Sequence, residues 1–283
     1  MKKAFKFMRD HRTEFPVKVM ARVLKVNRTA YYNWVKRPPS ARELQDRDLT
    51  RLIKEIHAAN RGVYGAPRIH AELRMEHGIR VSVKRVARLM RQARVSGLVR
   101  KKRGKTTVSV PGVRVADDLV LRNFTASGPD QIWATDITYL RTWEGWIYLV
   151  AVQDLFSRKI VGWAMADHMR TELVTDAVRM AVHRRNPAKG LIHHSDQGSQ
   201  FVSLKFGQLA GANGIARSMG HVGSAYDNAV AETFFATLKK ELIHRRSWPT
   251  KPELRSEVFE FIEGFYNRQR RHSYLGWLSP AEF

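Results

Sequence analysis

The sequence of 283 residues contains no cysteine. This absence excludes disulfide bonds, thiolate zinc sites and a cysteine nucleophile. No apolar run approaches the eighteen or so residues that a membrane-spanning helix needs. The basic N-terminus is not followed by an apolar core of signal-peptide type, so we expect a cytoplasmic protein. No phosphate loop of the Walker type is present, so nothing indicates a reaction driven by nucleotide hydrolysis.

Acidic residues are scarce in the first part of the chain. Residues 1–125 contain 31 Lys+Arg and 10 Asp+Glu, whereas residues 126–283 contain 19 and 16, and the net charge is +24. This distribution predicts that the N-terminal part holds a polyanion while the C-terminal part does chemistry. An anionic membrane would favour a long amphipathic helix, and none stands out.

Three acidic residues in the C-terminal half stand out by their surroundings. Asp136 is the single charge at the centre of residues 131–140, whose apolar and β-branched side chains indicate a strand. Asp196 ends a second strand-like segment that begins at residue 190, and a turn leading into a helix follows it. Glu232 lies in a third segment, which apolar residues at every fourth position mark as a helix: Val230, Phe234, Leu238 and Leu242.

The chemistry depends on whether these carboxylates converge. Two unit charges about 4 Å apart repel by about 4 kcal/mol at an effective dielectric of about 20, so a cluster must hold a proton or recruit divalent cations. Oxygen ligands favour Mg²⁺ or Mn²⁺ over zinc. Two such ions can activate a water or a 3′-hydroxyl and stabilise the leaving oxygen of a phosphodiester. The alternative is three unrelated acids: a strand Asp, a turn Asp and a solvated helix Glu.

The segments around these acids relate the chain to a known family. Residues 133–139 contain Asp136, residues 194–201 contain Asp196, and residues 227–229 precede Glu232. In this order they resemble the catalytic core of bacterial insertion-sequence transposases of the retroviral-integrase (DDE) type. The resemblance is closest to the second-reading-frame (OrfB-like) protein of the family whose elements carry two overlapping frames. Residues 266–280 look like the end of the same core.

The strand pattern predicts an α/β fold. Residues 133–140, 146–152 and 159–165 suit three antiparallel strands, residues 172–184 a helix, and residues 190–196 a parallel strand. This order is that of a ribonuclease H-like fold, a mixed five-stranded sheet with flanking helices, here preceded by all-α helix-turn-helix units. In that fold the first and fourth strands lie side by side and a later helix crosses them, which would bring Asp136, Asp196 and Glu232 together.

The N-terminal part predicts two helical units and a tether. Pro16 suits a first helical turn, and Asn27 can cap a second helix with Arg28 and Thr29 at its start and Trp34 as its core anchor. The arrangement looks like a DNA-reading helix-turn-helix, although a plain helical hairpin is the alternative. The expected segments are residues 1–40 (helix-turn-helix), 41–98 (a second such unit), 99–127 (basic linker) and 128–283 (catalytic core).

The second unit repeats the pattern. Gly78 suits the end of a helix that has Pro67 in its first turn, and Ser82 can cap the next helix. Three basic residues follow that cap and are expected to bind DNA, although a solvated face is equally compatible: Lys84, Arg85 and Arg88. The basic linker either follows a phosphate backbone or has no fixed contact.

Several neighbours of the three acids have two interpretations each. Asp154 fits a turn better than a fourth metal ligand. His194 is a candidate to support the site from behind the acids, and Asn228 either bonds near the ions or caps the helix. Lys239 is expected to contact DNA phosphate rather than pair with a carboxylate. Three tryptophans are expected in the core rather than as base-stacking platforms: Trp133, Trp146 and Trp163.

The resemblance implies a DNA transposase. Asp136, Asp196 and Glu232 would be catalytic and hold two Mg²⁺ or Mn²⁺ ions, cleaving the element's 3′ ends and transferring them to target DNA. The partners would be double-stranded DNA of the terminal inverted repeats and of the target, a second copy of the chain at least, and the upstream-frame protein as a fusion or partner. The protein would be cytoplasmic and associated with the bacterial nucleoid. The alternatives are a metal-dependent nuclease of the same fold without joining activity, and a non-catalytic DNA-binding regulator.

Overall fold

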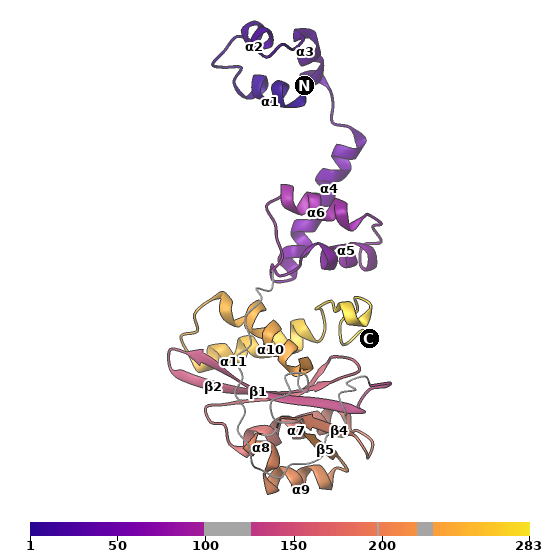
Figure 1. The fold of residues 1–283 in the computed structure, drawn as a ribbon, viewed down its shortest axis with the longest axis vertical. Helices are drawn as coiled ribbons and strands as arrows, with labels where there is room; N and C mark the ends of the chain where they lie inside the picture. The colour runs from indigo at the N-terminus through magenta and orange to yellow at the C-terminus, as the bar shows by residue number, and fades with distance from the viewer. Residues whose placement is uncertain (99–125, 197, 220–228) are drawn as a thin grey trace. The chain divides into compact units, whose positions relative to one another are not determined.

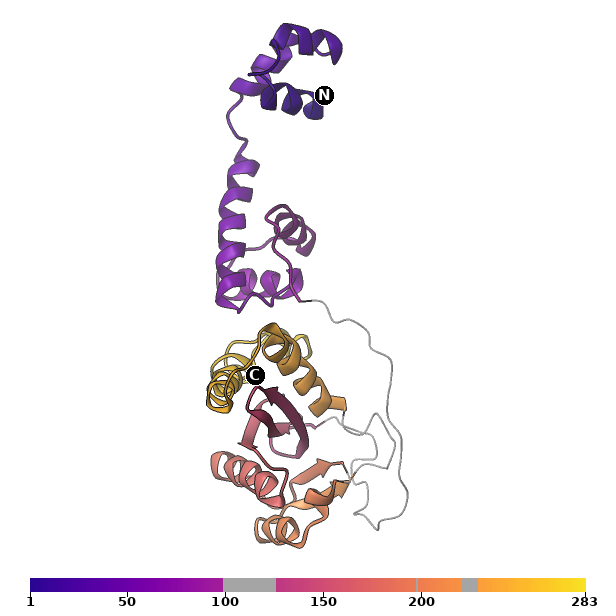
Figure 2. The ribbon, with the colours of Figure 1, turned by 90° about the vertical axis from the view of Figure 1, so that its left-hand side faces the viewer.

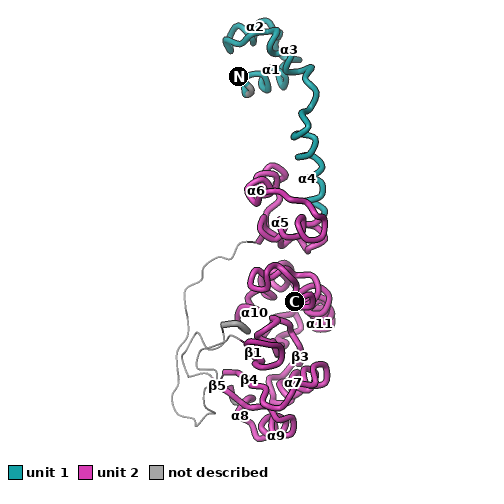
Figure 3. Tube along the Cα trace, turned by 90° about the vertical axis from the view of Figure 1, so that its right-hand side faces the viewer, with its two compact units in different colours: residues 1–55 teal, residues 56–283 magenta. Residues whose placement is uncertain are grey.

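The computed structural model describes residues 1–98, 126–196, 198–219 and 229–283. Two compact units divide the chain, residues 1–55 and residues 56–283 (Figure 3). The four segments predicted from the sequence have other boundaries than these two units, and that division of the chain stays a prediction. Within the described ranges, no helix is both long and apolar enough to span a bilayer.

The first unit contains three short helices, α1 (Lys2–Asp10), α2 (Val17–Val23) and α3 (Arg28–Lys36), and part of α4 (Ala41–Ala59). Asn27 caps α3 as predicted, because its side chain accepts a hydrogen bond from the Ala30 amide at 3.1 Å. The core consists of five buried residues: Phe5, Met8, Met20, Ala21 and Tyr31. Trp34, predicted as its anchor, is partly buried and packs against this cluster, whereas Tyr31 is the fully enclosed residue of α3. Helix α1, which we did not predict, supplies Phe5 and Met8 and so determines which α3 side chain is buried.

The second unit begins with the helices α5 (Ala66–Met75) and α6 (Val83–Gln92). Pro67 lies in the first turn of α5, and Gly78 has a φ of +65° after the helix ends. The Ser82 hydroxyl accepts a hydrogen bond from the Arg85 amide at 3.2 Å and caps α6. These three predictions from the sequence are confirmed.

A five-stranded mixed sheet forms the centre of the second unit, in the order β3-β2-β1-β4-β5. Its strands are β1 (Ile132–Thr142), β2 (Gly145–Asp154), β3 (Ile160–Ala166), β4 (Ile192–Ser195) and β5 (Ala216–Met219). The first three are antiparallel, and β4 is parallel to both β1 and β5. The predicted fold class is confirmed. We did not locate β5 in the sequence because it has only four residues and no apolar alternation.

Helices cover both faces of the sheet (Figures 1 and 2). Helix α7 (Thr171–Arg185) packs on β2 and β3. A Cβ on Gly162 would lie 2.2 Å from the Ala177 carbonyl oxygen, so only glycine allows this approach. Helix α10 (Ala229–Glu241) contacts β1 and β2 on the other face, beside α11 (Lys251–Phe259). The remaining helices are α8 (Ser199–Val202), α9 (Leu204–Ala212), η1 (Ile243–Arg245), η2 (Glu260–Tyr266) and η3 (Ser273–Leu275).

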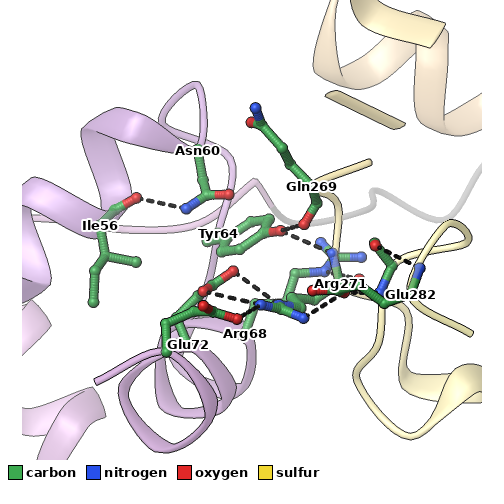
Figure 4. A network of polar contacts seen from close by, with 10 residues as sticks. Ile56, Asn60, Tyr64, Arg68, Glu72, Gln269, Arg271 and Glu282 are labelled. Carbon is green, nitrogen blue, oxygen red and sulfur yellow. Dashed lines mark hydrogen bonds and ion pairs between the residues drawn. The ribbon is translucent and has the colours of Figure 1, made fainter. Parts of the chain in front are cut away.

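Polar contacts attach α5 to the C-terminal segment within the second unit (Figure 4). The Tyr64 hydroxyl donates to the Gln269 carbonyl at 3.1 Å and accepts from the Arg271 amide at 2.8 Å. Burial raises the pKa of Tyr64 to about 12. The Arg271 guanidinium donates to Glu72 at 3.0 Å. Arg68 donates to the Arg271 carbonyl at 3.0 Å. Buried and partly buried polar groups therefore join α5, and Tyr64 just before it, to the C-terminal segment.

Candidate active site

The strand register brings two of the predicted acids to one end of the sheet. Strands β1 and β4 pair in parallel up to Thr135 opposite Ser195. Asp136 and Asp196 are the next residues along each strand. Because neighbouring strands lie about 4.8 Å apart, the backbones of the two aspartates leave the paired region side by side.

The alternation of side chains places both aspartates on one face. Residues two apart on a strand share a face, so Asp136 lies with Ala134, and Asp196 continues the face of His194. The other face carries Trp133, which packs with α7 in the main core, and His193, which bonds to Thr135. The two acids therefore belong to the face that α10 covers.

Helix α10 supplies the third acid. Glu232 lies in its first turn and is exposed. Phe234, Leu238 and Leu242 are buried, which confirms the apolar stripe predicted for them. The side chain of Val230, the remaining member of that stripe, lies outside the described residues.

Lys239 lies two turns after Glu232 on the same helix and is partly buried. Its Nζ is 5.3 Å from the ring centroid of Tyr139, on β1 three residues after Asp136. Burial lowers the pKa of Lys239, and the charge of Asp136 opposes that shift. The ammonium group is therefore within electrostatic reach of the first aspartate.

Asp136 experiences the field of the other two acids. The pKa of Asp136 is raised to about 7, first by burial and then by the charges of Asp196 and Glu232. The hydrogen bond from the Ile137 amide at 2.7 Å and the charge of Lys239 oppose this rise. The ionised form of Asp136 is thus destabilised by its surroundings, and a nearby cation would stabilise it.

The chemistry of the donors fits a hard divalent cation. All three side chains offer only carboxylate oxygens, which are the ligands that Mg²⁺ and Mn²⁺ prefer. Among the side chains that the structure describes, no three His, Asp or Glu are already close enough to form a metal cage. Asp196 and Glu232 are both exposed, so their side chains have room to turn.

The other residues considered near the site have varied positions. His194 is fully buried, and its Nδ1 is 2.9 Å from the Ser218 hydroxyl of β5. Asn228 lies outside the described residues. Asp154 has the predicted turn role, because its carboxylate accepts from the amides of Ser157 and Asp130.

The prediction for the tryptophans is right for two of the three. Trp133 and Trp163 are buried. Trp146 is 47% exposed, so its predicted core position is wrong. Trp146 lies near the β1–β2 turn, beyond the part of the sheet that α7 packs on. The alternation of residues along a strand does not indicate how far along the strand a helix will cover it.

The predicted DNA-binding residues lie at two helix starts. Arg28 and Thr29 are exposed in the first turn of α3. Lys84 is exposed and Arg85 is partly buried in the first turn of α6, and Arg88 is partly buried in the second turn. Their positions at capped N-termini are compatible with DNA binding, and their role stays a prediction.

Comparison with known proteins defines the class and then the family. Integrase core domains match residues 126–225 and 213–280, and a helix-turn-helix-like domain matches residues 43–103. With the mixed sheet, these matches define a DDE-type polynucleotidyl transferase with a helix-turn-helix-like region.

Two relatives match nearly the whole chain. The 31 kDa protein of insertion element IS600 from Shigella sonnei is 41% identical over 264 residues, which are 93% of this chain and 97% of the relative. Transposase InsF for insertion sequence IS3A from Escherichia coli (strain K12) is 39% identical over 279 residues, 98% of this chain and 96% of the relative. The chain belongs to the InsF-type family of insertion-sequence transposases, which confirms the predicted resemblance. Among solved structures, the HTLV-2 integrase catalytic core domain in complex with magnesium is 15% identical, covers 56% of this chain and 98% of its own, and has a TM-score of 0.44.

Proposed function

We propose that the chain cleaves the 3′ ends of its insertion element and joins them to target DNA, with Asp136, Asp196 and Glu232 as the catalytic acids. The observation that carries the proposal is the parallel register of β1 and β4, which sets Asp136 and Asp196 side by side at the end of their pairing. The raised pKa of Asp136, caused first by burial and then by the two other acids, agrees with it. A buried carboxylate destabilised by two further acids is what a cation-binding phosphoryl-transfer site requires.

The acids would hold two Mg²⁺ or Mn²⁺ ions. When bound, such ions polarise the attacking and leaving oxygens of a phosphodiester. Asp136 is held by the Ile137 amide and by its place in β1, so it would be the rigid ligand. Asp196 accepts a hydrogen bond from the Gly198 amide at 3.1 Å and would complete the pair from β4. Glu232 would approach from α10.

Other side chains would orient the DNA. Lys239 is within electrostatic reach of Asp136 and would contact the phosphate next to the scissile bond. His194 would support Asp196 from the same face of β4, through its hydrogen bond with Ser218. Asn228 is proposed near the ions because the family motif contains it.

The helical region would recognise the terminal repeats. Arg28 and Thr29 on α3 and the basic residues of α6 would contact the DNA grooves and backbone. Two DNA ends require at least two copies of the chain. A fusion with the upstream-frame protein is the arrangement that the family implies. Association with the bacterial nucleoid would follow from DNA binding.

The test is Asp136→Asn with an end-labelled element duplex and a target plasmid in Mg²⁺. We expect cleavage and joining to be lost while the dissociation constant for the duplex changes by less than about threefold, because the substitution removes one charge from a chain of net charge +24. Joined products from the variant would refute the assignment. Cleaved but never joined products from the wild-type protein would instead indicate a nuclease.

A further inference from the structure

Two exposed aromatic rings lie on the β1–β2 hairpin, further along the chain than Asp136. Tyr139 on β1 is 58% exposed and Trp146 on β2 is 47% exposed. Their ring centroids are 5.2 Å apart and the ring planes stand at 87°, so they form one edge-to-face pair. Large aromatic side chains exposed together are uncommon on a folded surface unless they contact something.

Cationic groups flank this aromatic pair. The guanidinium carbon of Arg141 is 5.9 Å from the Trp146 ring centroid, and Lys239 Nζ is 5.3 Å from that of Tyr139. Arg141 and Trp146 are directly opposite each other in the β1–β2 register. A surface that alternates π-faces and positive charge is complementary to bases joined by phosphates.

The pair is close to the chemistry. Tyr139 is three residues beyond Asp136, or about 10 Å along the strand at about 3.4 Å per residue. Residues 132–135 of β1 pair with β4, and this pairing ends before Asp136. Because Tyr139 is an odd number of residues from Asp136, its side chain leaves the other face of β1. Lys239, which is within electrostatic reach of Asp136, has its Nζ 5.3 Å from the Tyr139 ring centroid and so connects the two positions.

The support beneath the rings is rigid. The β1–β2 turn is tied to the segment before α11, since the Trp143 amide donates to the Trp248 carbonyl at 3.0 Å. The Glu144 carboxylate accepts from the Lys251 amide at 2.7 Å. These bonds limit the movement of the turn that follows Tyr139 and precedes Trp146, which lowers the entropy that binding costs.

We propose that Tyr139 and Trp146 stack against unpaired bases at the end of the DNA, next to the scissile phosphate, while Arg141 and Lys239 contact the adjoining phosphates. This inference rests on the proposed function, because it assumes that the scissile phosphate lies at Asp136. Cleavage and joining at a DNA end require the strand to leave the duplex path, and stacking stabilises bases that have lost their partners.

The experiment compares two duplexes with the full-length chain in the absence of divalent ions. One duplex is fully paired, and the other has the same length but mismatched terminal base pairs. Because base–aromatic stacking changes affinity by about 5- to 150-fold per base, the wild-type protein should bind the mismatched duplex more tightly by a factor in that range. Trp146→Ala and Tyr139→Ala should reduce the ratio of the two affinities toward one. Trp146→Phe, which retains a ring, should keep most of it.

A matched control uses another exposed aromatic residue beside an arginine. Tyr274 is 59% exposed, with the Arg158 guanidinium 4.2 Å from its ring centroid. Tyr274→Ala should leave the affinity ratio unchanged. A second readout is 2-aminopurine at the terminal position, whose fluorescence should be quenched by the wild-type protein and much less by Trp146→Ala.

The outcomes separate this proposal from the proposed function. Equal affinity ratios for wild-type and both alanine variants would overturn the stacking proposal, whatever Asp136→Asn does. If Trp146→Ala alters only the sedimentation mass, the surface is a contact between copies of the chain and the proposal is also wrong. Joining by Asp136→Asn would refute the catalytic assignment even if the stacking ratios behave as expected.

Discussion

Replacing Arg271 should cost several kcal/mol, because its guanidinium is buried against a buried carboxylate. Its side chain is 4% exposed and that of Glu72 is 10% exposed. Burial by itself would lower the pKa of Arg271, but hydrogen bonds and charge from Glu72, with Glu282 and Glu76, raise it overall. The ion pairs therefore more than offset the cost of burying the guanidinium.

The size of the stability loss in an Arg271 variant depends on which of its partners is buried. Removing one member of a buried ion pair typically costs about 3–5 kcal/mol, since the other charge stays buried without compensation. Glu76 and Glu282 are partly exposed, so each of their ion pairs contributes at most about 1 kcal/mol. Arg271→Met should thus destabilise the second unit by about 3–5 kcal/mol. At about 2–4 °C per kcal/mol, its melting temperature should fall by about 6–20 °C.

Calorimetry and urea denaturation would measure this loss, and hydrogen exchange would locate it. The amides of α5 should exchange faster in Arg271→Met, because α5 carries Glu72 and is joined to the C-terminal segment there. Arg179→Met is a matched control. That arginine also pairs with a carboxylate, Asp176, but both side chains are more than half exposed and the loss should be at most about 1 kcal/mol.

The double variant Arg271→Met with Glu72→Met decides whether the reasoning is right. If the single variant is unstable because it leaves a buried unpaired carboxylate, removing that carboxylate should recover most of the lost free energy. A double variant no more stable than the single one would show that the loss comes from packing or from the exposed partners. A single variant within about 1 kcal/mol of wild type would contradict the argument from burial.

Two further predictions concern the sheet. Burial lowers the pKa of His193 to about 3, below its unfolded value of about 6.5. As pH falls below about 6.5 the unfolded chain takes up a proton that the folded chain does not, so this histidine reduces stability by up to about 1.4 kcal/mol per pH unit. His193→Gln should flatten that slope in urea titrations, and an unchanged slope would count against a buried neutral imidazole. Gly162→Ala should lower the free energy of unfolding by at least about 2 kcal/mol, because its Cβ would strike the Ala177 carbonyl. Gly211→Ala is the control, since its Cβ would meet open space and the change should be neutral or stabilising. Equal stabilities of the two variants would contradict the close approach of α7 to β3.

Predictions that depend on local patterns were confirmed by the structure. The caps at Asn27 and Ser82 each use a side chain three residues before the amide that it accepts from. Asp154 closes its turn through Ser157, three residues along the chain. Such features are encoded by neighbouring residues and need no tertiary contact to be recognised.

The sequence by itself determined the family, the strand order up to β4 and the three acids proposed for catalysis, because each is carried by a short contiguous motif. Only the tertiary structure decided which apolar side chains are covered: Tyr31 is buried by a helix from elsewhere in its unit, and Trp146 is left exposed where the packing of α7 on the sheet ends. It also revealed that Arg271 reaches Glu72 across nearly two hundred residues of chain. Local patterns specify which elements form, whereas burial depends on what packs against them, and that is settled by contacts between residues far apart in the sequence.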